Sequence, residues 1–350
     1  MSRTDAAPDL PSERTVLVSV IATLSSRPVP GEIYTTRMKT ETSTSRPRLF
    51  DSAYLAKRRD RAERCGFQGR GDFLHSEVAT LLGERLGEVT RAFDTAAIVG
   101  SGGGLHHAVL APHLKHIQQV EWSERRAKRA GVEATPFSET LPLAEASLDL
   151  VVSMLEMHWL NDPVGHLIQL RRALRPDGLM IAALFGGETL NELRSALTQA
   201  EIDVTGGLSP RIAPMGEIRD LGGLLQRAGL TMPVADSERI RTSYPDIIAL
   251  MHDLRAMGET NILTDRRRVP MRRDMLVRAE KIYAEKHSLP DGRLSATFEV
   301  IFLTGWAPAP DQPVALRPGS AKARLADALS VEEHGLGEKA SPTVPRPRKA

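Results

Sequence analysis

The first half of the folded region alternates between amphipathic segments and continuous apolar runs. Residues 73–89 carry apolar side chains at the three- and four-residue spacing of an amphipathic helix. Apolar runs at residues 148–155 and 179–185 are typical of strands that are buried on both faces. A helix is expected between them, at residues 163–174, followed by a turn at 175–178. This alternation predicts an α/β fold with a doubly wound, mostly parallel sheet, whose strand carboxyl ends share one edge.

Beyond residue 188 the pattern changes to mostly helical segments and one last strand. A strand at residues 296–305 is separated from the early sheet by these helices. Such an order is typical of a late insertion, which we expect to form a helical cap over the ligand edge at about 205–290. The helices are expected at about 188–202, 215–228, 245–257 and 271–287.

The two ends of the chain differ in composition from its middle. Residues 16–24 resemble the apolar core of a signal peptide, but three acids precede them and no small-residue cleavage site follows. We therefore interpret residues 1–45 as a disordered or mis-assigned N-terminal extension, with Met38 as the expected start. Residues 308–350 are rich in proline and charge and are predicted to be a mostly disordered tail. The folded domain is then expected at 46–307.

The bulk composition excludes several classes of protein. A net charge of +2 does not indicate a nucleic-acid-binding protein. The single cysteine, Cys65, rules out an intrachain disulfide and a thiolate metal cluster, and it suits a reducing, cytoplasmic location. The histidines lack the carboxylate spacing of a metal site, so no metal is expected. No apolar run reaches the roughly 18 to 20 residues that span a bilayer, which leaves a peripheral contact with a membrane complex as the expected kind of membrane association.

Two basic clusters have either of two interpretations. One runs over residues 46–70, and the other comprises five arginines between residues 266 and 273. Such runs form solvated faces in most proteins. The alternative is a docking surface for an acidic partner, such as a folding protein subunit.

A glycine-rich turn carries the first chemical signal. Residues 97–104 read A-I-V-G-S-G-G-G and come before an expected helix at 105–114. Because glycine lacks Cβ, Gly100, Gly102 and Gly104 let a ligand lie against the backbone near free N–H groups of a helix start. A plain structural turn remains the alternative reading of this segment.

An acid at the end of the next expected strand strengthens the ligand reading. That strand, at residues 117–121, ends in Glu121, which lies 21 residues after Gly100. In mononucleotide-binding α/β units a carboxylate at this place accepts hydrogen bonds from both ribose hydroxyls. Two ligand classes fit these residues, a dinucleotide such as NAD and S-adenosylmethionine.

Longer motifs resemble those of class I S-adenosylmethionine-dependent methyltransferases. Residues 139–162 read E-T-L-P-L-A-E-A-S-L-D-L-V-V-S-M-L-E-M-H-W-L-N-D, and L-R-P-D-G-L and F-G-G-E-T-L follow. With D-L-R-A-M-G at residues 253–258, they are similar to the branch that holds the mitochondrial complex I assembly factor acting as a protein arginine hydroxylase. The resemblance covers about 48–329 and implies a seven-stranded, Rossmann-like methyltransferase sheet. Because of this resemblance, an NAD-dependent dehydrogenase is the least favoured of the functional hypotheses.

The resemblance implies roles for individual residues by their positions. The glycines would line the methionine part of the cofactor, Glu121 would hold its ribose, and Trp122 would lie against its adenine. Phe137, Ser138 and Glu139 would form the loop at the adenine edge, and Met154 and Leu155 would face the sulfonium. His158, Trp159, Asn161, Asp162 and Glu188 would follow on the substrate side.

Two departures from the family pattern concern the cofactor. Ile98 stands where most members carry an acid, two residues before the first glycine, and Phe137 and Ser138 replace an acid in the adenine loop. Each lost charged hydrogen bond would weaken binding by about 1 to 3 kcal/mol. A cofactor-poor assembly chaperone is therefore an alternative to an enzyme.

The catalytic residues stay unknown at this level. His158 is a candidate base, or a histidine bonded to the backbone at a strand end. Glu188 is a candidate substrate contact, or a first-turn acid that complements a helix dipole. Asn161 and Asp162 read first as the N-cap of the helix that starts at Pro163.

The function implied by the resemblance is modification of a protein, through S-adenosylmethionine binding. The substrate would be an arginine of a complex I subunit during assembly, with hydroxylation implied by the resemblance alone. Methylation of a small acid or of a carrier-bound carboxylate is the alternative within the enzyme class.

Overall fold

The computed structural model describes residues 48–64, 72–100, 102–135 and 138–313. The chain divides into two units, Met1–Pro47 and Arg48–Ala350, and all described residues belong to the second. The extension expected at 1–45 and most of the tail expected at 308–350 lie outside the described residues, so both stay predictions. So does Phe137.

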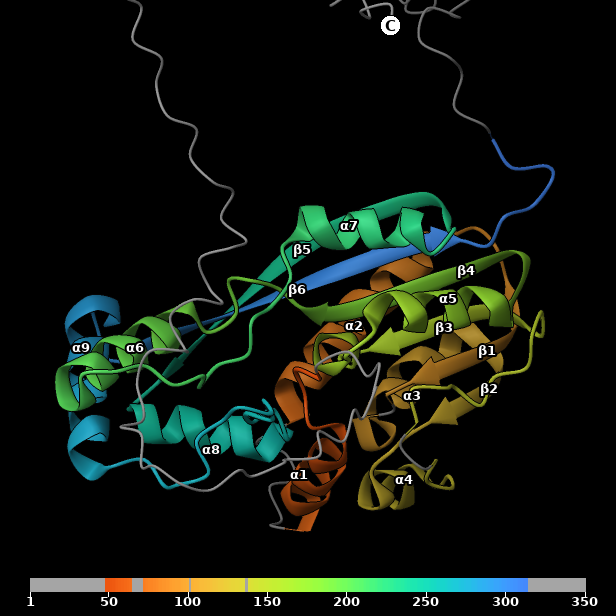
Figure 1. The fold of residues 1–350 in the computed structure, drawn as a ribbon. Helices are drawn as coiled ribbons and strands as arrows, with labels where there is room; N and C mark the ends of the chain where they lie inside the picture. Colours follow the sequence, from red (N-terminus) through yellow and green to blue (C-terminus); the bar gives the residue numbers. More distant parts are fainter. Residues whose placement is uncertain (1–47, 65–71, 101, 136–137, 314–350) are drawn as a thin grey trace, which may run out of the picture. The chain divides into compact units, whose positions relative to one another are not determined.

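The described residues form one mixed sheet of six strands, in the order β2-β1-β3-β4-β6-β5 (Figure 1). The first four strands are parallel, while β6 pairs antiparallel with both β4 and β5. The α/β class and the parallel early sheet are confirmed, although six strands are described where seven were expected. The strands are β1 Phe93–Val99, β2 Leu114–Val120, β3 Leu148–Met154, β4 Leu174–Phe185, β5 Thr231–Tyr244 and β6 Leu294–Trp306.

Helices cover both faces of the sheet, which explains the continuous apolar strands. In β1, Ala96 and Ile98 pack into the core on the side of α2 (Asp72–Gly87) and α3 (Leu105–Leu110). Ala97 and Val99 alternate with them and pack on the other side, with α5 (Pro163–Ala173) and α7 (Ile218–Arg227). Successive side chains of a strand point to opposite faces, so each residue of β1 from Ala96 onward is buried.

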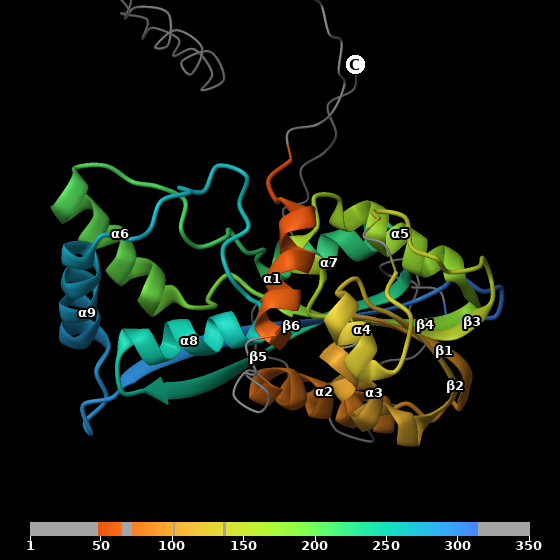
Figure 2. The same ribbon diagram turned by 90° about the horizontal axis from the view of Figure 1, so that it is seen from below.

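The second half contains the expected helices and one strand that the pattern did not reveal. The helices are α6 (Asn191–Thr205), α7, α8 (Ile247–Met257) and α9 (Arg273–His287). The interval 205–290 was predicted to be a helical cap, and this prediction was wrong for Thr231–Tyr244, which form the strand β5. β5 is an edge strand with many exposed polar side chains, so it lacks an apolar run and depends on hydrogen bonds to β6. β5 and β6 extend past the parallel strands toward α6, α8 and α9 (Figures 1 and 2).

Two boundaries differ from the prediction for local reasons. The helix expected at 105–114 ends at Leu110, and a 3-10 turn at Ala111–His113 leads directly into β2. Pro112 in this turn has no N–H to continue an α-helix. The turn expected at 175–178 is an irregularity within β4, because Leu148 pairs with Leu174 and the next pair joins Leu150 to Leu179.

At the carboxyl edge of the parallel strands lie α1 (Ser52–Arg64) and α4 (Glu124–Ala130), side by side in Figure 2. The start of α1 is fixed by Asn161. Its Oδ1 accepts a hydrogen bond from the Phe50 N–H (2.9 Å), and its Nδ2 donates to the Phe50 carbonyl (3.1 Å). None of the described helices is both long and apolar enough to cross a membrane.

Candidate functional site

The glycine turn follows β1 at the ligand edge of the sheet. Gly100, Gly102, Gly103 and Gly104 have φ angles between 57° and 94°, a region that other residues rarely adopt. The Gly100 N–H donates to the carbonyl of Val120 at the end of β2 (3.0 Å). The turn is therefore tied to the strand that leads to Glu121.

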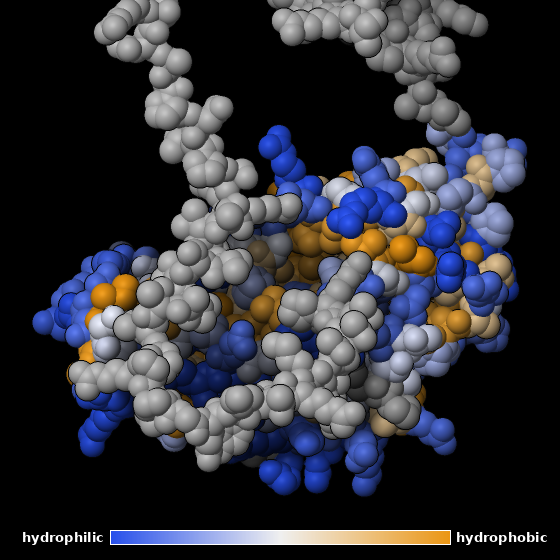
Figure 3. Space-filling view, viewed as in Figure 1, coloured by the Kyte–Doolittle hydropathy of each residue, from blue (hydrophilic) through white to orange (hydrophobic). Residues whose placement is uncertain are grey.

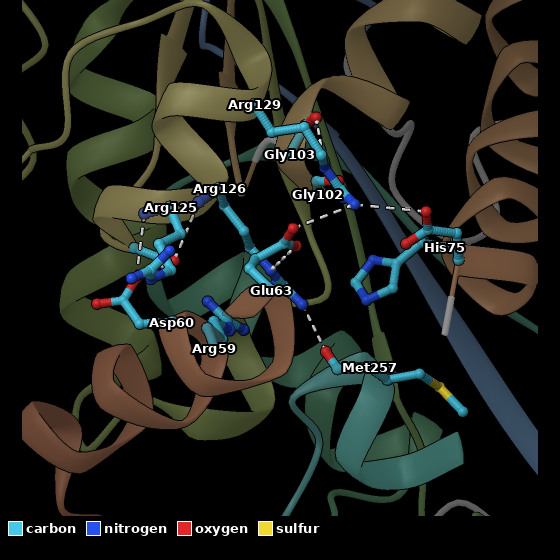
Figure 4. A network of polar contacts seen from close by, with 12 residues as sticks. Arg59, Asp60, Glu63, His75, Gly102, Gly103, Arg125, Arg126, Arg129 and Met257 are labelled. Atoms are coloured by element: carbon cyan, nitrogen blue, oxygen red, sulfur yellow. Dashed lines mark hydrogen bonds and ion pairs between the residues drawn. The ribbon is translucent and has the colours of Figure 1, made fainter. Parts of the chain in front are cut away.

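Side chains of the protein pack tightly around this turn. A Cβ on Gly100 would lie 2.6 Å from Cγ of Glu156, and one on Gly103 would meet the guanidinium of Arg129. Arg129 also donates to the carbonyls of Gly102 (2.6 Å) and Gly103 (3.0 Å), as Figure 4 shows. The absence of Cβ atoms is thus required by the protein's own packing.

A buried histidine pair supports the turn from the side of α2. His106 Nδ1 lies 2.5 Å from the Gly100 carbonyl oxygen, and His106 Nε2 lies 3.2 Å from His75 Nδ1. Burial lowers the pKa of His106 to about 4 and that of His75 well below its usual value. Both rings are therefore neutral near pH 7, with His106 donating to Gly100 and accepting from His75.

Glu121 stands directly after β2 and is 1% exposed. One of its carboxylate oxygens accepts from the Ser123 N–H (3.1 Å), and the charges of Arg59 and Arg126 act on the same buried region. The neighbouring Trp122 packs in the core on the α5 side of the sheet. The structure places Glu121 at the edge shared with the glycine turn.

The segment after β3 lies beside the turn as expected. Met154 and Leu155 are buried, and Leu155 has a φ of 51°, which strains a residue other than glycine. Strained backbone is concentrated at functional sites. Ser138 and Glu139, from the expected adenine loop, are exposed. Ile98 is fully buried in apolar core.

A buried ion pair joins α1 to the segment that follows β3. Arg59 Nη1 donates to both carboxylate oxygens of Glu156, at 2.6 and 2.7 Å, and Arg59 Nη2 lies 3.7 Å from Glu259. Burial raises the pKa of the Glu156 carboxyl to about 7, although Arg59 opposes this. Burial acts to lower the pKa of Arg59, but Glu156 and Glu259 hold it above its usual value.

Polar contacts fasten α1 to α4 on the far side of Arg59 (Figure 4). Asp60 accepts from the Ser123 hydroxyl at 2.6 Å. Glu63 lies 3.6 Å from Arg126 and 3.3 Å from Arg129. Arg59 is thereby held in place by its own helix.

Glu259 is a functional candidate that sequence reasoning missed. Its Oε2 accepts from Trp159 Nε1 (2.5 Å) and lies 3.1 Å from His158 Nε2, while its Oε1 has no hydrogen-bond partner among the described residues. Burial would raise its pKa, but His158, Arg59 and Trp159 hold that pKa below the usual value, so the carboxylate is ionised. The bond to Glu259 replaces the backbone bond considered for His158. Glu259 follows the D-L-R-A-M-G motif directly, and that motif is the sequence signal that could have identified it.

A cavity of about 790 Å³ opens beside Glu259 and Trp159. A volume of this size suits a ligand or a long side chain. Its apolar lining comes from β4, α6, α8 and β6, and includes Phe185, Leu193, Leu197, Met251, Leu254 and Phe298.

Comparisons with known proteins agree with this geometry. A methyltransferase-domain family model matches residues 98–182. The mitochondrial arginine-hydroxylase NDUFAF5 of Danio rerio is 35% identical over 290 residues, which cover 80% of this chain and 89% of the relative. The chain belongs to the methyltransferase-fold family that includes NDUFAF5. It is thus a member of an enzyme family.

The chain is also similar to enzymes that are named for a different activity. A malonyl-[acyl-carrier protein] O-methyltransferase of Laribacter hongkongensis is 36% identical over 259 residues, which cover 69% of this chain and 84% of the relative. Among solved structures, the YcgJ protein of Bacillus subtilis has a TM-score of 0.47 at 14% identity, over 67% of this chain and 99% of that one.

For this member of the NDUFAF5 family, the remaining predicted residues have structural positions. Asp162 is the N-cap of α5, since its side chain accepts from the Gly165 N–H at 2.9 Å. Glu188 is partly exposed, forms an ion pair with Arg239 at 2.7 Å, and does not line the cavity. Among the residues described, no group of three or more His, Cys, Asp or Glu side chains is arranged to hold a metal ion.

A second, smaller cleft of about 350 Å³ runs along α1. Tyr54 and Arg58 line both cavities, so the cleft adjoins the larger one. Hydrophilic residues cover the surface over α1 and α4 in Figure 3. Five of the seven residues that line the cleft are basic, and we call them the basic strip: Lys57, Arg58, Arg61, Arg64 and Arg125.

Proposed function

We propose that this chain binds S-adenosylmethionine at the carboxyl edge of its sheet and modifies an arginine of a protein partner during assembly of respiratory complex I. The observation that carries the proposal is Glu259. Glu259 is an ionised, buried carboxylate that lines a cavity large enough for an arginine side chain, and its Oε1 has no hydrogen bond to a described residue, only a 3.7 Å ion-pair contact with Arg59. A carboxylate is the group that binds guanidinium best in proteins.

The described residues at the edge fit the cofactor in chemistry. In this proposal Glu121 accepts from the ribose hydroxyls, and the Leu155 carbonyl and the Arg59 guanidinium suit the ammonium and carboxylate of an amino acid. Arg59 Nε is buried and has no hydrogen-bond partner among the described residues. When bound, S-adenosylmethionine supplies an electrophilic carbon on its sulfonium.

In this proposal the cavity residues hold and orient the substrate arginine. Glu259 Oε1 accepts from the guanidinium, while His158 and Trp159 fix the carboxylate through Oε2. Apolar side chains of α6 and α8 pack along the aliphatic stem and exclude water. Holding the reacting group in one orientation supplies a large part of the rate in such a site.

The basic strip supports a protein as the partner. Its exposed members Lys57, Arg61, Arg64 and Arg125 have no acidic side-chain partner among the described residues. Asp60 is the one acid of the cleft, and its Oδ1 is engaged by Ser123 and by the Arg125 N–H. An acidic protein surface docked here would bring its residues to the mouth of the large cavity.

Mass spectrometry of complex I subunits from a deletion strain tests the proposal. An arginine that gains an oxygen atom or a methyl group in the parent strain should be unmodified in the deletion strain. The wild-type gene should restore it, and Glu259→Gln should not. Glu188→Gln removes an exposed carboxylate outside the cavity and should restore it fully. An unchanged set of modified arginines on deletion overturns the proposal.

A second function, methylation of a carboxylate on an acyl carrier, is favoured by the arginines of the cavity. Arg58, Arg255 and Arg268 line it without an acidic partner among the described residues, whereas Arg266 is paired with Asp51. Unpaired guanidinium groups attract an anionic substrate. In an assay with malonyl-loaded acyl carrier protein, methyl ester formation that is lost in Arg255→Gln and kept in Glu259→Gln would support this function over the first.

A further inference from the structure

We propose that Glu156, while it is paired with Arg59, blocks access of a ligand to the glycine turn. A ligand with an amino-acid carboxylate then binds by displacing Glu156 and pairing with Arg59 itself. The inference rests on the proposed cofactor site and names the residue that sets its affinity. It concerns a contact between α1 and the segment after β3.

Glu156 occupies the face of the turn that a ligand would need. The Cβ position of Gly100 lies 2.8 Å from Oε1 of Glu156 and 2.6 Å from its Cγ. The Glu156 residue is 2% exposed, so no solvent layer separates it from the turn. A ligand can lie against Gly100 only after this side chain has moved.

Arg59 offers a second carboxylate-binding edge. Its hydrogen bonds to Glu156 both use Nη1, while Nη2 has a long hydrogen bond of 3.4 Å to the Leu155 carbonyl and a 3.7 Å ion-pair contact with Glu259. Nε has no hydrogen-bond partner among the described residues, although Arg59 is 1% exposed. A buried guanidinium with an unused N–H group is a site for an anion, because leaving such a donor unpaired is costly.

Of the two residues in the ion pair, Glu156 and not Arg59 is the one that can move away. Arg59 sits on α1, which Asp60 and Glu63 fasten to α4. Glu156 follows the end of β3, and Arg59 is its one side-chain partner in the described part of the chain. Rotation of Glu156 would therefore open the turn without displacing a helix.

Burial and the charge of Glu121 also favour the exchange. Glu121 from the end of β2 repels it, while Arg59 from α1 and Arg126 from α4 attract it. Burial raises the pKa of Glu156 to about 7, so its hold on Arg59 weakens as it gains a proton near neutral pH. A ligand carboxylate that stays ionised would then compete better.

Calorimetry with S-adenosylmethionine on the full chain tests the exchange. Glu156→Ser removes both charge and bulk, and it should bind at least about tenfold more tightly than wild type, the equivalent of one modest charged contact. Glu156→Gln removes the charge alone and should fall between the two. Glu192→Gln is the matched control, since Glu192 is a buried carboxylate bonded to Thr297 away from the turn. Its affinity should equal that of wild type.

A second probe separates exchange from a simple gain of space. Methylthioadenosine has no amino-acid carboxylate, so Glu156→Ser should improve its binding less than that of S-adenosylmethionine. Equal gains for the two probes, or no gain for either Glu156 variant, would overturn the inference. Circular dichroism of each variant checks folding, and Glu156→Gln preserves the shape of the side chain if the serine variant unfolds.

The outcomes are independent of the proposed arginine modification. Tighter cofactor binding in Glu156→Ser supports the exchange even when no arginine is modified by the chain. A confirmed arginine modification with unchanged affinity in both Glu156 variants overturns the exchange alone.

Discussion

The imidazole Nδ1 of His106 lies 2.5 Å from the carbonyl oxygen of Gly100, which links a buried neutral ring to the glycine turn. The pKa of His106 is lowered from 6.5 to about 4 by burial, and His166 is lowered to a similar value. The unfolded chain therefore binds more protons than the folded chain between these pH values. The contribution of the two histidines to the free energy of unfolding should therefore be complete above pH 6.5. It should fall as the pH drops toward 4, by about 1.4 kcal/mol per pH unit for each histidine.

Urea unfolding of wild type and His106→Asn at a series of pH values measures this slope. The pKa of Glu156, raised from 4.5 to about 7, gives a slope of opposite sign between those values, so the difference between the two proteins isolates His106. His106→Asn should lose stability less steeply than wild type as the pH falls. Parallel curves would contradict a neutral His106.

Gly100→Ala should destabilise the fold more than Gly131→Ala. Both glycines have positive φ, 84° and 71°, so both substitutions carry a backbone strain of about 1–2 kcal/mol. A Cβ at Gly100 would also clash with the Met154 carbonyl oxygen, whereas one at Gly131 meets nothing within 4 Å. We expect an additional loss of about 1–3 kcal/mol for Gly100→Ala in chemical denaturation. Equal losses would show that the turn adjusts to the added atom.

Trp159→Phe should lower the free energy of unfolding by about 1–3 kcal/mol, because it leaves a buried Glu259 carboxylate oxygen with one donor fewer. The phenyl ring preserves most of the packing against Phe50, whose ring centroid lies 5.5 Å from that of Trp159. Trp306→Phe is the control, since the indole N–H of Trp306 makes no hydrogen bond to a described residue. Thermal unfolding should separate the two variants clearly, and a similar effect in both would mean that ring size is the cause.

Charge reversal on the basic strip should slow association with the protein substrate. The triple variant Lys57→Glu, Arg61→Glu and Arg64→Glu is expected to reduce the association rate by at least about tenfold at low salt, and the difference should shrink at high salt. The measurement is surface plasmon resonance with the complex I subunit that carries the modified arginine.

Three exposed basic residues of α9 provide a control with the same change in net charge. The variant carries Arg273→Glu, Lys281→Glu and Lys286→Glu, and none of these three residues lines either cavity. This variant should associate nearly as fast as wild type. If both triple variants are slowed equally, overall charge and not the strip governs association.

Local patterns in the sequence were enough for the framework of the site. The apolar runs at residues 148–155 and 179–185 predicted β3 and most of β4, because a strand buried on both faces is apolar at nearly every position. Parallel strands end on one edge, so the glycine turn and Glu121 were expected to meet there, as they do. Asp162 was predicted as an N-cap from its place before a proline, and capping depends on residues three apart.

Only the tertiary structure decided which charged side chains meet. Arg59 and Glu156 are 97 residues apart in sequence, and His158 and Glu259 are 101 apart. Nothing in the periodicity of either segment specifies such a pair, since a charged residue on a helix is by default a solvated one. The packing of α1 and of the end of α8 over the strand ends removes these groups from water. Once buried, each charged or polar group needs its partner to offset the loss of hydration. Local sequence patterns were sufficient to predict a Rossmann-like edge with a glycine turn, whereas the packing of distant segments is what brings Glu156 against that turn and Glu259 to the wall of the cavity.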